Sequence, residues 1–165
     1  MKTLRFMLCV VLLSISTMAL AQSDAQKSFD KLKTLAGSWE GAMDGKALQV
    51  SLRVTSKGNA LMHEMTVAGI PDDPITMFNL DGARLLMTHY CDAGNQPRFV
   101  GTISPDGKTI TFDFIGATNL LSSQMGHMQH VVFTLIDADH HTEKWEFAMA
   151  DGKPMGGLLD LRRTK

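Results

Sequence analysis

The stretch LAGSWEG, residues 35–41, decides the fold because it joins a short amphipathic segment to a long series of hairpins. Before it, apolar residues recur at helical spacing from Ala25 to Leu35, which predicts a short helix over residues 23–35. After it, turn-forming sequences follow one another at nearly regular intervals. A tryptophan between two glycines therefore marks the point where the helix ends and the first strand begins.

The turn-forming sequences predict tight hairpins. Asp-Gly and related pairs favour the positive φ angles of such turns, because glycine has no Cβ atom to clash. The turns are MDGK at 43–46, SKGN at 56–59, LDGA at 80–83, CDAGNQ at 91–96, SPDGKT at 104–109, IDADHH at 136–141 and ADGK at 150–153.

The segments between these turns are rich in Val, Ile, Thr, Phe and Leu, which favour strands. Alternation supports this, because Ile110, Phe112 and Phe114 share one face of their segment. With a strand through Trp39, the predicted strands are residues 47–55, 60–67, 75–79, 84–91, 98–104, 109–115, 127–136, 143–148 and 155–162.

This pattern predicts an all-β fold, an antiparallel up-and-down β-barrel of about ten strands with a short N-terminal helix. Closure into a barrel removes the exposed sheet edges that a meander would otherwise leave. A two-sheet sandwich is the alternative. Residues 116–126, GATNLLSSQMG, are too long for a hairpin turn, and we interpret them as a loop near the barrel mouth or a connecting helical turn.

Residues 1–21 have the layout of a secretory signal peptide, with basic Lys2 and Arg5, an apolar core and the triplet Ala19-Leu20-Ala21. The apolar run is shorter than the ~20 residues that a membrane-spanning helix needs. We therefore expect cleavage after Ala21, no stable membrane anchor, and a periplasmic or extracellular protein. Residues 22–165 then form a single barrel domain.

Composition excludes several classes of protein. The chain has 16 basic and 17 acidic side chains, and the loss of Lys2 and Arg5 makes the mature chain more acidic, so no nucleic-acid partner is expected. Only Cys91 remains after processing, which leaves no intramolecular disulfide. Motifs of a nucleophile elbow, a phosphate-binding loop or a zinc hydrolase are absent, which disfavours an enzyme.

The helix, the Gly37-Ser38-Trp39-Glu40-Gly41 motif and the Gly-punctuated meander together resemble the calycin superfamily of lipocalin-like barrels. The motif is most similar to the nitrobindin-like branch and to related exported bacterial domains of unknown function, although Met43 stands where that branch usually has a further glycine. The resemblance implies that Trp39 lies across the closed end of the barrel. It also implies haem binding through a late histidine, but His140 and His141 are predicted to lie in a turn.

A ten-strand barrel is wider than its side chains need for filling, so the interior is a candidate ligand cavity. The many methionines of the mature chain suit an adaptable apolar surface, and His89 is a candidate polar contact if its strand face points inward. Arg98 follows a turn and is a candidate partner for a ligand carboxylate at the rim. The predicted ligand-binding residues are Trp39, Met65, Met87, His89, Arg98, Phe112, Phe114 and Trp145.

These features lead to one function and two alternatives. The first is an exported carrier that binds a small hydrophobic or amphipathic molecule inside the barrel. The second is a nitrobindin-like protein that handles haem or nitric oxide, with His89 or His130 as the iron ligand. The third is a periplasmic copper(I) site, because thioether sulfurs favour that ion. His127 and His130 are three residues apart on a predicted strand, so they face opposite sides and cannot share a metal unless the strand is broken there.

Overall fold

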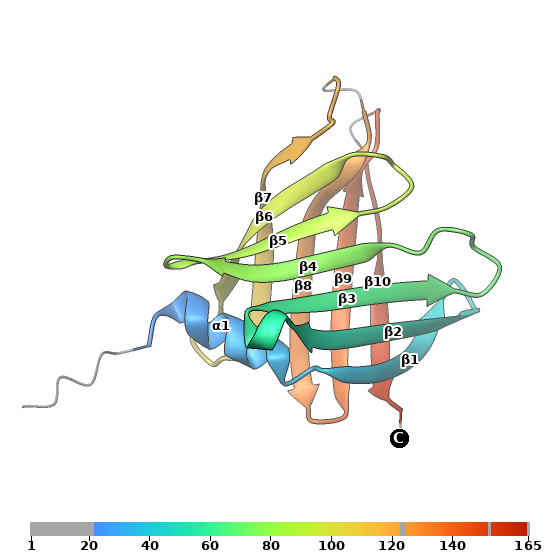
Figure 1. Cartoon of the computed structure of the whole chain (residues 1–165). Helices are drawn as coiled ribbons and strands as arrows, with labels where there is room; N and C mark the ends of the chain where they lie inside the picture. Colours follow the sequence, from blue (N-terminus) through green and yellow to red (C-terminus); the bar gives the residue numbers. More distant parts are fainter. Residues whose placement is uncertain (1–21, 123–124, 152, 165) are drawn as a thin grey trace, which may run out of the picture.

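Strands and tight turns alternate along the chain, as the spacing of the turn sequences predicts (Figure 1). The computed structural model describes residues 22–122, 125–151 and 153–164, and the predicted signal segment lies outside them. The helices are α1 (Asp24–Lys33) and the short 3₁₀ turn η1 (Ser56–Gly58). The strands are β1 (Gly37–Met43), β2 (Lys46–Thr55), β3 (Ala60–Val67), β4 (Ile75–Asp81), β5 (Arg84–Tyr90), β6 (Gln96–Ile103), β7 (Thr109–Thr118), β8 (His127–Asp137), β9 (His140–Ala148) and β10 (Pro154–Arg163).

The ten strands close into an antiparallel barrel in which each strand pairs with its neighbours in sequence. The first and last strands complete the circle, through the pairs Trp39–Arg163 and Glu40–Arg162. The predicted all-β barrel is therefore confirmed, and the sandwich alternative is wrong. In the described part of the chain, no helix combines the length and the hydropathy needed to cross a bilayer.

The two ends of the barrel differ because successive hairpins point in opposite directions. The β2–β3, β4–β5, β6–β7 and β8–β9 turns share one end with α1, which packs against β2, β4, β5 and β6 (Figure 1). Ser23 caps this helix through a hydrogen bond from the Gln26 N–H, and Phe29 and Leu32 are buried beneath it. This end is closed, and the other five connections surround the opposite end, the mouth.

The opening motif LAGSWEG now has a geometric explanation. Gly37 has a φ of +140°, and a Cβ atom there would lie 2.5 Å from Nη1 of Arg163. A Cβ atom on Gly41 would collide with the carbonyl oxygen of Asp160 on β10. Between them, Trp39 is 1 % exposed, and its indole N–H donates to the Leu35 carbonyl at 2.8 Å. The two glycines therefore let the chain approach β10 and Arg163 closely.

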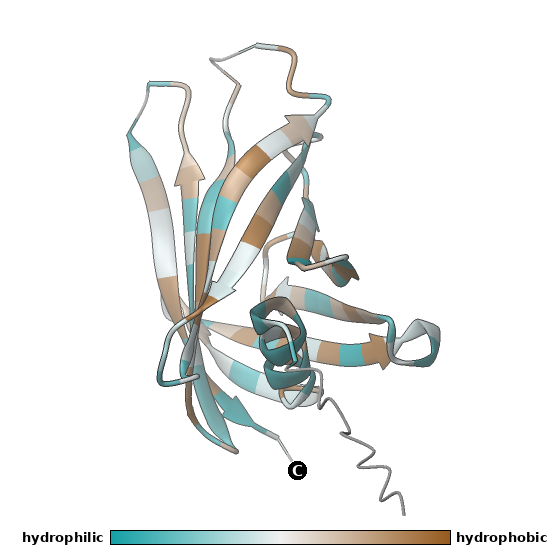
Figure 2. Ribbon diagram, turned by 90° about the vertical axis from the view of Figure 1, so that its left-hand side faces the viewer, coloured by the Kyte–Doolittle hydropathy of each residue, from teal (hydrophilic) through white to brown (hydrophobic). Residues whose placement is uncertain are grey.

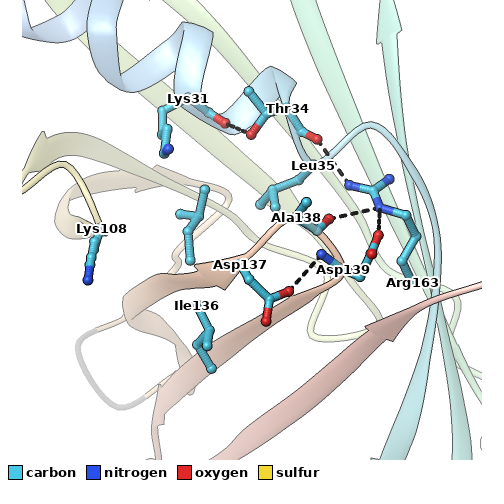
Figure 3. A pocket seen from close by; sticks show the side chains of 10 residues that line it. Lys31, Thr34, Leu35, Lys108, Ile136, Asp137, Ala138, Asp139 and Arg163 are labelled. Atoms are coloured by element: carbon cyan, nitrogen blue, oxygen red, sulfur yellow. Dashed lines mark hydrogen bonds and ion pairs between the residues drawn. The ribbon is translucent and has the colours of Figure 1, made fainter.

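Arg163 contacts several separate segments at the closed end (Figure 3). Its guanidinium donates to the carbonyl oxygens of Ala36, Thr34 and Ala138 at 2.9, 3.1 and 3.0 Å, and it lies 3.3 Å from the Asp139 carboxylate. The same group lies 4.1 Å from the centre of the Trp39 ring. One side chain thus joins the C-terminal end of α1, the first strand and the β8–β9 turn.

The barrel interior is mainly apolar and follows the alternation of the strands. Hydrophilic and hydrophobic residues alternate along most strands (Figure 2), and the inward set forms one continuous core. Phe78, Phe112 and Phe133 contact one another near its centre, with ring centroids 5.4 to 6.0 Å apart.

Two local predictions were wrong. The strand β9 begins at His140 rather than at residue 143, so His140 and His141 lie on a strand and not in a turn. The strand β7 continues to Thr118, which shortens the predicted loop at 116–126. On β8, where a break between His127 and His130 was left open, the pairing with β9 shifts register between Met128 and His130. The loop still lies at the mouth end, and residues 123–124 within it lie outside the described residues.

The contacts of Arg163 predict that it contributes much more to the free energy of unfolding than its neighbour Arg162 does. Arg163→Ala removes three hydrogen bonds, an ion pair and a cation–π contact, so we expect the free energy of unfolding to fall by about 2–4 kcal/mol. Arg162→Ala is the control, because Arg162 is exposed and lies 3.7 Å from an exposed Asp160, so we expect a change below about 1 kcal/mol. Urea denaturation measures both, and equal losses would contradict the assigned role.

Candidate functional site

A fully buried carboxylate, Glu143, lies in the middle of the barrel on the inward face of β9. Its Oε2 atom lies 3.1 Å from Nε2 of His63 and accepts a hydrogen bond from the Trp145 indole at 2.9 Å. Its Oε1 atom lies 3.0 Å from Nε2 of His141. All four side chains are at most 7 % exposed. The barrel thus encloses a polar network rather than a uniform apolar core.

The network keeps Glu143 ionised. Burial opposes ionisation, but the charge of His63 and the hydrogen bonds from His141 and His63 outweigh it and lower the pKa of Glu143 to about 2. A carboxylate only accepts hydrogen bonds, so Nε2 of each histidine carries the proton and donates. Nδ1 of His141 is buried and has no hydrogen-bond partner among the described residues.

Trp145 connects this network to the mouth. Its indole N–H is fixed by Glu143, and its ring lies between the rings of His63 and His89, with centroid distances of 5.6 and 5.3 Å. Because Glu143 fixes the orientation of the indole, the buried network also positions the Trp145 ring, which lines the cavity at the mouth.

His89 is the next polar group toward the mouth. It is 2 % exposed, and its Nδ1 atom lies 2.8 Å from the hydroxyl oxygen of Thr76. Burial, together with the charge of nearby His63, lowers the pKa of His89 to about 4, so the ring is neutral at pH 7. No described residue forms a hydrogen bond with its other ring nitrogen, Nε2.

A cavity of about 390 Å³ opens above Trp145 and His89 at the mouth. This volume lies within the usual range for small-molecule sites. Its lining is mostly apolar and sulfur-rich, with carboxylates at the rim. The lining residues are Met43, Asp44, Met65, Asp72, Pro74, His89, Cys91, Asp92, Met128, Trp145, Phe147, Met155, Gly156, Gly157 and Leu159.

The rim of this cavity is acidic. Asp44, Asp72 and Asp92 come from the β1–β2, β3–β4 and β5–β6 connections, which meet at the mouth. Desolvation and the charges of Asp92 and Asp73 raise the pKa of Asp72 above its usual value. Burial and the charges of Asp72 and Asp92 also raise the pKa of the Cys91 thiol, which therefore stays protonated at neutral pH.

Only part of the predicted ligand-binding set lies at this cavity. Met65, His89 and Trp145 line it. Trp39 lies at the closed end, and Met87 and Phe112 are fully buried in the core. Phe114 packs against the core from a partly buried position, and Arg98 lies exposed on the outer face of β6, away from the cavity lining.

The other predicted metal ligands do not converge. Nδ1 of His130 lies 3.2 Å from Asp113 of the neighbouring strand β7, outside the cavity lining. The register shift in β8 therefore does not bring His130 into the cavity. His127 is within hydrogen-bond distance of the Met125 carbonyl. Within residues 22–122, 125–151 and 153–164, no three His, Cys, Asp or Glu side chains are grouped so as to hold a metal ion.

Sequence reasoning missed Glu143, assigned His141 to a turn, and did not foresee that the candidate His63 pairs with Glu143. The predicted turn at 136–141 hid the start of β9, so the alternation of Glu143, Trp145 and Phe147 within the predicted strand was not extended back to His141. That alternation was a usable signal, because a charged residue in phase with two aromatic residues on one strand face predicts a buried carboxylate. His63 has no comparable local signal, since its partner is 80 residues away.

A larger hollow of about 630 Å³ lies at the closed end, outside the barrel (Figure 3). It is lined by the end of α1 and the β8–β9 turn, including Lys31, Ile136 and Asp137. The polar groups at its inner edge are those that bind Arg163, and Asp137 accepts from the Asp139 N–H. We therefore assign its inner edge to the closure of the fold.

Comparison with known proteins supports the fold only. No family model and no curated protein matches the chain. The structure is similar to the crystal structure of Rv2717c from M. tuberculosis, with a TM-score of 0.60 and 14 % identity over 84 % of this chain and 98 % of that chain. A protein of unknown function from the DUF3598 family of Nostoc punctiforme aligns with a TM-score of 0.27 and 7 % identity over 83 % of this chain and 99 % of that chain, a likeness too low to carry an argument.

The buried network predicts a strong dependence of stability on Glu143. Glu143→Ala leaves two histidines and an indole without their acceptor, so we expect a loss of about 3–5 kcal/mol in the free energy of unfolding. The matched control is Glu146→Ala on the same strand, where the carboxylate pairs with Lys144 at the surface. We expect that variant to lose less than about 1 kcal/mol in chemical denaturation. Similar losses in both variants would contradict the network.

The lowered pKa of His89 predicts a specific pH dependence. Its pKa is about 4 in the folded chain and 6.5 as an ordinary value, so between these pH values the unfolded chain binds a proton that the folded chain does not. This contribution to stability is complete above pH 6.5 and is lost as the pH falls toward 4. In His89→Gln, the loss of unfolding free energy between pH 7 and pH 4.5 should be smaller by about 2 kcal/mol. Identical urea titrations of both proteins across this range would refute the prediction.

Proposed function

We propose that the chain is a carrier that binds one small apolar or amphipathic molecule in the cavity at the barrel mouth. The observation that carries this proposal is the composition of the cavity, in which four methionines and two aromatic rings surround a single buried histidine. Apolar area of this kind supplies binding free energy, and a few fixed polar groups orient the ligand. Methionine side chains adapt to ligands of different shape.

The expected export of the protein fits this proposal. A carrier in the periplasm or outside the cell meets molecules that do not dissolve well, and the signal-like residues 1–21 are the basis for placing it there. The cavity of about 390 Å³ suits a small hydrophobic molecule rather than a macromolecule. We also propose, from the Gly37–Gly41 motif and the ten-strand barrel, that the chain is a calycin-like protein related to the nitrobindin-like branch.

The chemistry of the mouth does not fit the haem alternative. His89 presents a free ring nitrogen to the cavity, as an iron ligand must. However, three aspartates and no Lys or Arg belong to the described lining, so the carboxylate groups of haem would meet like charges. His130, the other candidate, pairs with Asp113 outside the cavity lining.

Copper(I) is the second candidate function, and one observation favours it. Met43, Met65, Met128 and Met155 line the same cavity as Cys91, which brings soft sulfur ligands from five connections or strands together. Thioether and thiol groups select copper(I) over harder ions. The protonated thiol places this candidate after the carrier, and among the described residues no three His, Cys, Asp or Glu side chains are grouped to add further ligands.

A cavity-filling substitution tests the carrier proposal. Gly157 lines the cavity and pairs with Trp145 on the adjacent strand β9. A Cβ atom at Gly157 would meet nothing within 4 Å, so Gly157→Leu should fill part of the cavity without displacing the strand. Nile red, a neutral apolar dye, should bind the wild-type protein at one molecule per chain and bind Gly157→Leu about tenfold more weakly, since each excluded methylene costs about 0.8 kcal/mol.

The control is Leu158→Gln, because Leu158 is 64 % exposed on the outer face and its change should leave dye affinity unaltered. Thermal unfolding checks that each variant is folded. An absence of saturable dye binding, or equal binding by wild type and Gly157→Leu, would overturn the proposal. Stoichiometric displacement of the dye by copper(I), added without oxygen, with no displacement by octanol would favour the copper candidate.

A further inference from the structure

The mouth of the cavity carries negative charge that no described ion pair neutralises. Asp44, Asp72 and Asp92 line it, and none of them forms a salt bridge with a described residue. Of the described lining residues, none is Lys or Arg. In a cleft with low-dielectric walls, charges of one sign attract a ligand of the opposite sign.

The carboxylates are close enough to influence one another. Asp72 accepts a hydrogen bond from the Asp92 backbone N–H at 3.2 Å. Desolvation, together with repulsion from Asp92 and Asp73, raises the pKa of Asp72. A positively charged ligand would relieve this repulsion, whereas an anionic ligand would increase it.

A metal ion does not fit this rim as well as an organic cation does. The described acidic, histidine and cysteine side chains form no group of three that could coordinate an ion. The apolar residues below the rim, including Met65, Met128 and Phe147, would also contribute nothing to a hydrated metal ion. They provide contact area for a hydrocarbon chain.

A second feature points to a ligand independently of the rim. His89 is 2 % exposed and lines the cavity, and its Nε2 atom has no hydrogen-bond partner among the described residues. Nε2 is not one of the buried side-chain atoms that lack a partner among the described residues, which are Asn95 Oδ1 and His141 Nδ1, so it is open to the cavity, where a few polar groups orient a ligand. When Nδ1 donates to Thr76, Nε2 of the neutral ring is an acceptor that can receive an N–H of the ligand.

We propose that the cavity binds an amphiphile whose polar end is a protonated amine, with its hydrocarbon part on the methionines and Trp145 and its ammonium group among the rim carboxylates and His89. This assignment rests on the proposed carrier function and specifies the class of ligand. The aromatic rings of Trp145 and Phe147 add a favourable surface for a cation.

Three ligands of equal chain length test the assignment. Octylamine is cationic at pH 7, octanol is neutral, and octanoate is anionic, so they differ mainly in charge. Calorimetric titration of the wild-type protein should rank them in that order, with octylamine about tenfold tighter than octanol. The preference for the amine should shrink as salt concentration rises, because salt screens exposed charges.

The matched variant replaces Asp44, Asp72 and Asp92 together by Asn. Asn retains the side-chain oxygen that accepts from the Asp92 N–H and tolerates the φ of +51° at position 44, so the turns should be preserved. This variant should bind octylamine and octanol equally. Asp81→Asn at the closed end, where the carboxylate pairs with Arg84, is the control and should retain the preference.

The outcomes separate this inference from the carrier function. Binding of octanol without any preference for octylamine, or tighter binding of octanoate, would overturn the assignment of a cationic ligand and leave the carrier function intact. Failure of all three ligands to bind would overturn both proposals. Persistence of the amine preference in the triple Asn variant would show that the rim carboxylates do not cause it.

Discussion

The contact between Arg163 and Trp39 is the interaction on which the rest of the structure depends. A ten-strand meander closes only if its first and last strands meet, and here that pairing is short, with two residue pairs. Arg163 reinforces this seam by binding the face of Trp39, the end of α1 and the β8–β9 turn. Gly37 and Gly41 make the approach possible, because side chains there would strike Arg163 and β10.

Closure at one end leaves space at the other. The width of a ten-strand barrel exceeds what its side chains fill, and the closed half uses that width for Trp39, the phenylalanine cluster and α1. In the middle, Glu143 accepts from three donors and fixes Trp145. Above the Trp145 ring, side chains no longer fill the barrel, so His89 and four methionines line a cavity instead of a packed core.

The sequence predicted the fold well because turn signals and strand alternation are local properties. Asp-Gly turns defined the hairpins, and the period-two pattern of Ile110 and Phe112 identified an inward face. The site was predicted only in part, with Met65, His89 and Trp145 placed at the cavity. Pairings such as His63 with Glu143 could not be predicted, because they depend on barrel register between strands far apart in sequence. The turn assigned to His141 also concealed one member of the network.

The most direct test of the account is an NMR titration with the methionine methyl groups labelled with ¹³C, using octylamine as the ligand. The account predicts shifts for Met43, Met65, Met128 and Met155, which line the cavity, and none for Met87, which is buried in the core. Met62, which contacts Arg53 outside the lining, should also remain unchanged. Shifts confined to Met62 or Met87, or no shifts at saturating ligand, would contradict a binding site at the mouth.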